Sequence, residues 1–230
     1  MTPTQKIFQY QIWHLLSALF LILILQLYVS AKPSVLDGSL WGISTQAWFW
    51  LAVVIPVVHQ AYVWLVWRLE LYRQVFTERW GVRRAFRLYA IGFSILFVGR
   101  LIAIIFLAVS SRDTLGISPV IPYALAAVIT PLVGYLFYSV KRYFTMERAY
   151  GIDHFDKHYN EPFVKKGIFR YTDNGMYVFG LMILYLPGLL LLSESALWVA
   201  LFNHLFIWAH YYFTERPDMV VIYGTAPSGT

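Results

Sequence analysis

The sequence predicts an all-α, polytopic integral membrane protein with about six transmembrane helices, the last two of which form a hairpin. Two observations lead to this prediction. Of the 230 residues, 59% are hydrophobic and only 13% are charged, which is too little charge for the surface of a soluble domain of this size. The charges also leave five uncharged runs of at least 20 residues, the length that crosses a bilayer as a helix.

The six predicted spans belong to a single transmembrane domain over residues 1–230. The first run is too long for the apolar part of a signal peptide and has no small-residue cleavage site before Lys32, so we expect it to be retained. The third contains Arg100, and the link Ser193–Ser195 is so short that it forces the last two spans into a tight hairpin. The predicted spans are residues 8–30, 45–67, 88–111, 119–140, 176–193 and 196–214.

Basic residues are distributed unevenly between the two sides of this domain. If both termini lie on one side, that side holds 15 Lys and Arg, whereas only Lys32 and Arg112 lie on the other. Cytoplasmic loops carry such an excess, so we expect both termini and the site for any soluble ligand to face the cytoplasm. The net charge of +6 is then explained by the basic residues that orient the protein in a lipid bilayer, and we expect no nucleic-acid partner.

Two cytoplasmic segments separate the predicted spans. In residues 68–87, aromatic residues and leucine alternate with arginine at near-helical spacing, which predicts an interfacial helix on anionic headgroups or simply a topology anchor. Residues 141–173 should continue the fourth span as a helix and become irregular after Gly151.

Several chemistries lack their sequence signatures. The chain has no cysteine, which excludes disulfides, thiol catalysis and thiolate metal sites. It has no phosphate-binding glycine loop, no serine nucleophile elbow and no HExxH zinc motif. His154 and His158 have the i, i+4 spacing of ligands on a helix, but Gly151 argues against a long helix there, so we predict no metal site.

The hairpin brings two cytoplasmic ends together. The entering end reads GIFRYTDNGMYVFG (167–180) and the leaving end reads HYYFTERPDMVVIYG (210–224). Glycine-rich turns, amides, aromatic rings and charges therefore converge at the membrane surface. Such a concentration of polar groups is what a bound polar cofactor requires.

The sixth predicted span carries polar residues that are costly in a membrane unless they face the bundle interior or a wet cavity. Such residues indicate a functional site, although hydrogen bonding to neighbouring helices would also explain His204 and Asn203, and a solvated helix end would explain Glu215. Arg100 of the third span needs a carboxylate, a polar cavity or a lipid phosphate. At 100° per residue, one stripe holds His204, Trp208, Tyr211 and Glu215, and the adjoining stripe holds Asn203, His210 and Thr214.

The two converging segments resemble the phospholipid methyltransferase family, which includes phosphatidylethanolamine N-methyltransferases and is similar in its C-terminal half to isoprenylcysteine carboxyl methyltransferases. The resemblance rests on Asn174-x-Met176-Tyr177 followed by Gly180, and on Phe213-x-Glu215-x-Pro217 one hairpin later. It covers about residues 140–224, which would be the catalytic half. The spacing from tyrosine to glycine favours the phospholipid branch.

The resemblance implies that S-adenosylmethionine binds at the cytoplasmic end of the last helices and that a methyl acceptor enters laterally from the lipid. Family members often have proline at the position of Gly175 and a second acidic residue at that of Arg216. The aromatic residues Tyr171, Tyr177, Trp208, Tyr211 and Tyr212 could line the site of a cationic sulfonium. The cofactor-binding candidates are Tyr171, Asn174, Gly175, Met176, Tyr177, Gly180, His204, Tyr211 and Glu215.

An ethanolamine headgroup has to lose a proton before its nitrogen attacks. His210 or Glu215 could accept this proton, and His210 is preferred because its ordinary pKa lies nearer neutrality. Arg100 or the basic cluster in 141–170 could hold the phosphate. We therefore expect a lipid N-methyltransferase with His210 and Glu215 as catalytic residues and Arg100 as a substrate-binding residue.

Three other functions remain open at this point. The acceptor could be another lipid or a prenylcysteine carboxylate. The enzyme could instead be an NADPH-dependent reductase of a membrane lipid, since sterol reductases have a related helical arrangement. A non-catalytic lipid-binding protein with a degenerate cofactor pocket would account for Gly175 and Arg216. The sequence leaves open the number of methylations and the oligomeric state.

Overall fold

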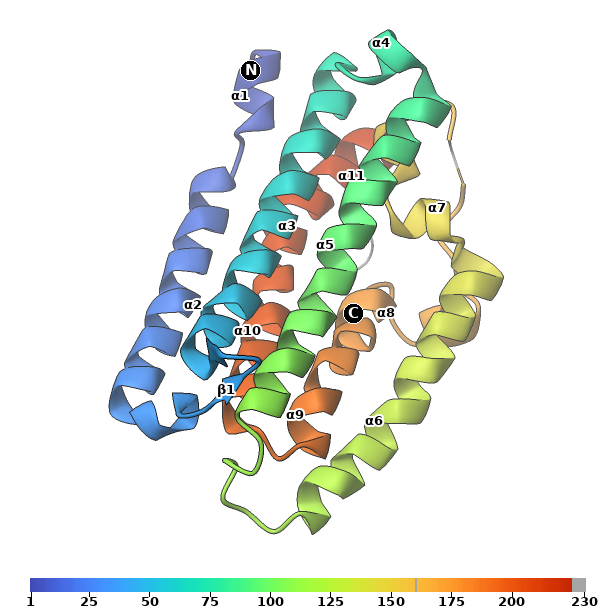
Figure 1. Cartoon of the computed structure of the whole chain (residues 1–230). Coiled ribbons are helices and arrows are strands. Elements are labelled where there is room, and N and C mark those ends of the chain that lie inside the picture. The colour runs from blue at the N-terminus through green and yellow to red at the C-terminus, as the bar shows by residue number, and fades with distance from the viewer. Residues whose placement is uncertain (160, 225–230) are drawn as a thin grey trace.

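The computed structural model describes residues 1–159 and 161–224, so the end of the predicted 1–230 domain lies outside the described part. The described chain is a bundle of helices (Figure 1). Strands in this part of the chain are limited to β1 (Ser39–Leu40) and β2 (Ile43–Ser44), which pair antiparallel between two long helices. The prediction of an all-α chain is confirmed.

Four helical segments of the described chain are long and apolar enough to cross a membrane, and they coincide with the first four predicted spans. The first comprises α1 and α2, and the fourth comprises α6 and the π turn η2. In chain order these elements are α1 (Pro3–Ile7), α2 (Gln11–Ala31), α3 (Thr45–Arg73), α5 (Val82–Ser110), α6 (Val120–Ser139) and η2 (Val140–Phe144).

The fifth predicted span, 176–193, is not one continuous helix. Pro187 has no backbone N–H to donate to Ile183, whose carbonyl instead accepts from Leu186 in a tighter 3-10 turn. The segment therefore divides into α8 (Gly175–Val178), the 3-10 turn η5 (Gly180–Tyr185) and α9 (Leu186–Leu190), which pack against α10 (Glu194–His210). The count of six spans stays a prediction.

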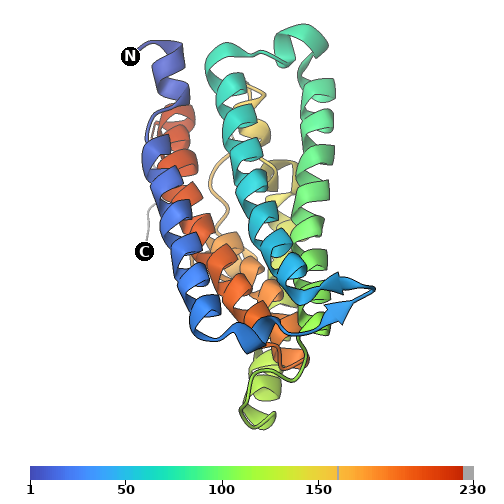
Figure 2. The same ribbon diagram turned by 60° about the vertical axis from the view of Figure 1, so that its left-hand side comes forward.

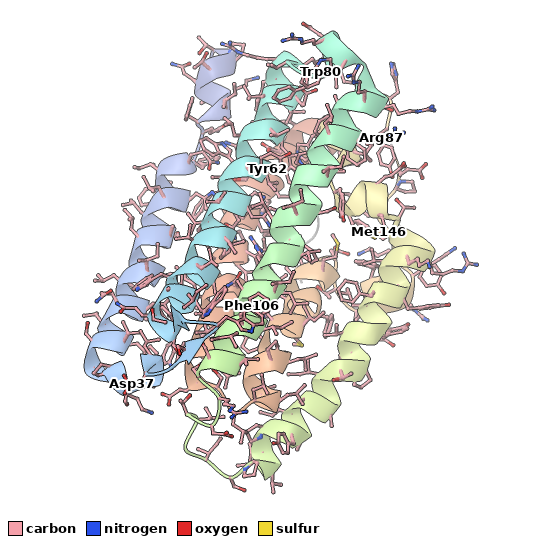
Figure 3. The ribbon with its side chains drawn as sticks, viewed as in Figure 1. Asp37, Tyr62, Trp80, Arg87, Phe106 and Met146 are labelled. Atoms are coloured by element: carbon pink, nitrogen blue, oxygen red, sulfur yellow. The ribbon has the colours of Figure 1, made fainter. Side chains whose placement is uncertain are left out.

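Of the two alternatives for residues 68–87, the interfacial helix was wrong, and the topology anchor stays a prediction. Helix α3 continues through this segment to Arg73, and α5 already begins at Val82. The carboxylate of Glu70 accepts the backbone N–H groups of Phe76 and Thr77 and so stabilises the turn before α4 (Thr77–Trp80). Figure 3 shows Trp80 and Arg87 at this end of the bundle and Asp37 at the opposite end.

The core of the bundle lies where α10 packs against α2, α3 and α5 (Figure 2). Small residues of α10, including Ala196 and Ala200, are completely buried and allow the close approach of the neighbouring helices. At the end of α5, the hydroxyl of Ser111 lies 2.7 Å from that of Ser193 and 2.8 Å from that of Ser195, so buried hydroxyls tie α5 to the start of α10.

The helix that was predicted to run from the fourth span to Gly151 ends earlier. Thr145 has φ +74°, which is incompatible with a continuous helix, and its side chain then caps α7 (Met146–Ala149). Two 3-10 turns follow, η3 (Ile152–His154) and η4 (Gly167–Arg170). The irregular chain after α7 thus folds against the ends of α3 and α6.

Helix α10 also departs from a straight α-helix. It passes into a π turn, η6 (Tyr211–Glu215), before α11 (Arg216–Tyr223). The sequence cause is Pro217, which cannot donate to the carbonyl of Phe213 four residues earlier. The extra residue in this turn changes the face on which Glu215 lies, so the predicted stripe from His204 to Glu215 does not continue as a straight line.

Candidate active site

A cavity of about 670 Å³ lies among α7, η3, α8 and α11, and we call it the polar cavity. Acidic groups reach it from three elements, namely Asp153, Asp173 and Glu215. Arg148 contributes a cation, which is held by its bonds to the carbonyl groups of Pro162 (2.7 Å) and Glu161 (3.3 Å). Aromatic side chains supply the remaining walls: Trp67, Phe144, Phe163, Tyr177 and Tyr223.

A buried acid–histidine pair forms one side of the polar cavity. His154 Nδ1 lies 3.0 Å from Asp153 Oδ1, and His154 Nε2 lies 3.8 Å from Asp218 Oδ2. Burial works to lower the pKa of His154, but the two carboxylates outweigh it and raise this pKa to about 9. Burial likewise works to raise the pKa of Asp153, but bonds with His154 and Tyr223 bring it below its ordinary value. The pair therefore carries charge of both signs at neutral pH.

Glu215 lies on the opposite side, where the hydroxyl of Tyr177 donates to its carboxylate. This bond joins the two segments that the sequence predicted to converge. Burial raises the pKa of Glu215 to about 8, an effect that His154 opposes and Asp153 and Asp218 reinforce. Glu215 can therefore exchange a proton near neutral pH.

A second cavity, of about 910 Å³, lies deeper in the bundle among α3, α5, α6 and α10, and we call it the apolar cavity. Phe93, Phe97, Leu136 and Phe137 form much of its wall. It also receives polar groups from three helices, since His59, Gln60, Arg100 and His210 line it.

These polar groups are not fully satisfied by the protein. Arg100 is 3% exposed and bonds through Nη2 to the carbonyl of Pro56 at 3.3 Å. Its Nε, both ring nitrogens of His59, Nε2 of Gln60 and Nδ1 of His210 are buried without a partner. Unpaired buried polar atoms are costly, so a cluster of them on one cavity is a feature of a ligand site.

The two cavities share a wall. Trp67, Ala149, Met176 and Tyr177 line both of them. Figure 3 shows Met146, which lies on the apolar cavity, at the start of α7 beside this wall. The two cavities are therefore adjacent.

Most of the predicted site residues lie at one of the two cavities. Asn174 and Glu215 line the polar cavity; Met176 and Tyr177 line both. The residues that line only the apolar cavity are Gly180, Arg100 and His210.

Four predicted cofactor residues line neither cavity. Tyr171 is 75% exposed, and His204 packs against the ring of Tyr185. Tyr211 is buried beside Tyr177, with ring centroids 5.7 Å apart, so it packs against a residue of the site without lining either cavity. Gly175 is buried under Phe169, where an added Cβ would lie 3.2 Å from the ring.

Sequence reasoning missed several residues of the polar cavity, namely Trp67, Arg148, Asp153 and His154. Trp67 belongs to a predicted span with no distinguishing pattern, and no sequence signal could have placed it at the site. In the sequence, His154 is recognised only as a possible metal ligand. In the described part of the chain, no group of three or more His, Asp or Glu side chains is arranged to hold a metal ion.

The fold is that of a helical membrane protein with a polar and an apolar cavity side by side. Residues 120–226 match the family model of phospholipid methyltransferases. This match confirms the predicted resemblance and extends it from residue 140 back through α6, and it indicates a methyltransferase. No curated protein and no solved structure matches the chain.

Proposed function

We propose that the protein transfers a methyl group from S-adenosylmethionine to the amine headgroup of a membrane phospholipid of the phosphatidylethanolamine type. The observation that carries this proposal is the wall of Trp67, Ala149, Met176 and Tyr177 between the two cavities. Methyl transfer needs a polar donor site next to a lipid acceptor site, and two cavities that share lining residues are adjacent in this way. The family match supports the same reaction.

The side chains of the polar cavity fit the methyl donor. Arg148 suits the donor's carboxylate, and the acidic and aromatic side chains suit its ammonium and sulfonium groups. The resemblance implies Asn174, Met176, Tyr177 and Gly180 as the residues around the adenosine, although Gly180 lines the apolar cavity and not the polar one. When bound, the donor supplies a methyl group on a cationic sulfur.

The apolar cavity suits the acceptor. Arg100 lies at its junction with a smaller cavity of about 420 Å³ between α5 and η5, since Phe97, Arg100, Gly180 and Leu181 line both. A phosphate bound by Arg100 would leave the amine directed toward Trp67 and Tyr177 and the acyl chains directed along η5 toward the lipid. The unpaired nitrogens of His59 and Gln60 would then gain partners.

The protein residues would act by positioning, by proton removal and by water exclusion. Aromatic side chains at the shared wall hold the two reacting atoms in line and keep water out. His210, which lines the apolar cavity with an unpaired Nδ1, would accept the proton that the ammonium loses. A cationic donor beside Glu215 would lower the pKa of this carboxyl group, and the ionised carboxylate, bonded to Tyr177, would then balance positive charge from the side of the polar cavity.

The proposed topology follows from the charge distribution. We infer that α8, η5 and α9 together form a fifth span and that α10 forms a sixth, paired with it as a hairpin. Both termini and the polar cavity would face the cytoplasm, because 15 of the Lys and Arg residues lie on that side. A soluble donor would then reach the polar cavity directly, and the bilayer would supply the acceptor.

The first test is isothermal titration of the detergent-purified chain with S-adenosylhomocysteine, with Glu215→Ala as the variant and Glu78→Ala, on α4, as the control. Micromolar binding that is lost only in Glu215→Ala supports the proposal. Absence of binding to a folded, monodisperse sample overturns it, and binding of NADPH to the same sample would favour a lipid reductase.

The second test identifies the acceptor. The purified chain is incubated with a labelled methyl donor and defined vesicles containing phosphatidylethanolamine, or with a prenylcysteine substrate. Label in the phospholipid supports the proposal. Label only in the prenylcysteine would keep the methyltransferase and replace the acceptor, and donor binding without any transfer would favour a non-catalytic protein.

A further inference from the structure

The π turn η6 leaves one backbone carbonyl without its helical donor. Pro217 lacks the N–H group that would bond to the carbonyl of Phe213 in an α-helix. Two side chains from distant helices replace it: Arg68 Nη2 donates to this carbonyl at 3.0 Å, and Gln11 Nε2 donates to it at 3.1 Å. The turn is therefore held from outside its own helix.

Arg68 uses its remaining donors in a way that links three parts of the chain. Nη1 donates to the carbonyl of Gln9 at 2.6 Å and to that of Ile7 at 3.1 Å, in the link between α1 and α2. Nε donates to both oxygens of Asp218, at 3.1 and 3.2 Å. Arg68 is 1% exposed and Asp218 is completely buried. Figure 2 shows α2 beside the C-terminal helices, and α2 contacts both α10 and η6.

The elements that Arg68 holds carry Glu215, which lines the polar cavity, and Asp218, which lies behind it near His154. Glu215 is the last residue of η6 and bonds to Tyr177. Asp218, in the first turn of α11, reaches His154 Nε2. A shift of η6 or α11 would therefore move Glu215 away from Tyr177 and change the charge around His154.

We propose that Arg68, assisted by Gln11, is a positioning residue that fixes the π turn and thereby sets the geometry of the polar cavity. This inference rests on the proposed function for its binding readout. It makes the first nine residues, through the carbonyls of Ile7 and Gln9, part of the support of the site. Arg68, Gln11 and these residues all lie outside the segment matched by the family model.

The test uses the paired variant Arg68→Met with Asp218→Asn, which removes both buried charges together and avoids an unpaired carboxylate. We expect this variant to fold and to bind S-adenosylhomocysteine about tenfold more weakly. The KM for the methyl donor should rise and the KM for the lipid should not, because small displacements at a site reduce affinity and rate. Amide hydrogen exchange should accelerate in peptides that cover 211–219. The control is Arg73→Met, which removes the contact with Thr4 Oγ1 at the surface of the same helix.

Gln11→Leu provides a second test that leaves both buried charges in place. It should weaken donor binding by a smaller factor and accelerate exchange over the same peptides. Unchanged donor affinity and unchanged exchange in either folded variant would overturn the positioning role. If the unaltered chain does not bind the donor, the proposed function fails, whereas faster exchange over 211–219 in the variants would still support the bracing of the π turn by Arg68.

Discussion

The indole ring of Trp67 stacks on the imidazole of His154, with centroids 4.1 Å apart and planes inclined by 18°. Trp67 comes from a long helix of the bundle, and His154 comes from the irregular chain after α7. Their contact therefore fixes that irregular chain against the bundle. It also places Trp67 between the polar and apolar cavities.

Gly151 makes this contact possible. It has φ +81°, and an added Cβ would lie 2.5 Å from the Trp67 ring. We expect Gly151→Ala to destabilise the fold by about 1–3 kcal/mol and to weaken donor binding, because backbone strain and a steric clash act together. The matched control is Gly81→Ala, with φ +74° and no neighbouring atom within 4 Å of the added Cβ. Chemical denaturation compares the two variants, and equal effects of both would contradict the role given to the clash.

Ala149 is the smallest side chain of the shared wall. Ala149→Leu places a larger side chain between the two cavities and should displace the two substrates from each other. We expect the methyl donor to bind as before while methyl transfer falls by about 100-fold, since a displacement of 1 Å can reduce the rate that much. Ala149→Ser changes size very little and should retain activity. Titration with S-adenosylhomocysteine and transfer of label to lipid measure the two effects separately. A proportional loss of binding and transfer would show that Ala149→Leu only damages the polar cavity.

The bond between Tyr177 and Glu215 joins the two converging segments. Tyr177→Phe removes a hydrogen-bond donor to the partly buried carboxyl group of Glu215, so the affinity for the methyl donor should fall by about 1–3 kcal/mol. Tyr212→Phe, at an exposed tyrosine one residue from Tyr211, serves as the control. Titration of both variants measures the difference. Equal affinity in Tyr177→Phe and the unaltered chain would show that this hydrogen bond does not contribute to binding of the methyl donor.

The stability of the fold should depend on pH through His154. Its pKa is raised from 6.5 to about 9 in the folded chain by Asp153 and Asp218, against the effect of burial. The stabilisation is complete below pH 6.5 and is lost as the pH rises through 9. The apparent melting temperature of the unaltered chain should therefore fall over this window more than that of His154→Gln. Parallel curves for the two proteins would contradict this pairing.

Three features could be predicted because each depends on local composition or a short motif. They are the first four spans, the convergence of 167–180 with 210–224, and the family resemblance. Apolar runs of sufficient length leave few alternatives to a membrane helix. The contact between Tyr177 and Glu215 agrees with the convergence predicted from the short link Ser193–Ser195, which is also a local property.

The rest depends on long-range packing that a single sequence does not display. In the sequence, Arg68 is one of several basic residues in a predicted cytoplasmic segment. In the structure it is buried and bonds to Gln9, Phe213 and Asp218. The π turn follows from Pro217, but its geometry is held by helices that are distant in the sequence. The polar cavity likewise includes Trp67, which no local pattern connects to Asn174 or Glu215.

Arg100 offers a test in which stability and activity should change independently. Its guanidinium is buried with one bond to the carbonyl of Pro56, and its Nε has no partner. A buried charge that is poorly paired is costly, so Arg100→Met should leave the stability unchanged or increase it by about 1–4 kcal/mol. The KM for the phospholipid should nevertheless rise, because the phosphate loses its cation, while S-adenosylhomocysteine binds as before.

Arg100→Lys keeps the charge and should recover part of the lipid affinity. The recovery should be incomplete because an ammonium group cannot make the bidentate contact of a guanidinium with phosphate. Lipid-dependent kinetics and thermal unfolding of the same preparations measure both effects. If Arg100→Met unfolds the chain, the guanidinium has a structural role. If the variant is stable and its KM for the lipid is unchanged, Arg100 does not bind the acceptor, and the basic residues of 141–170 become the site to examine for the phosphate.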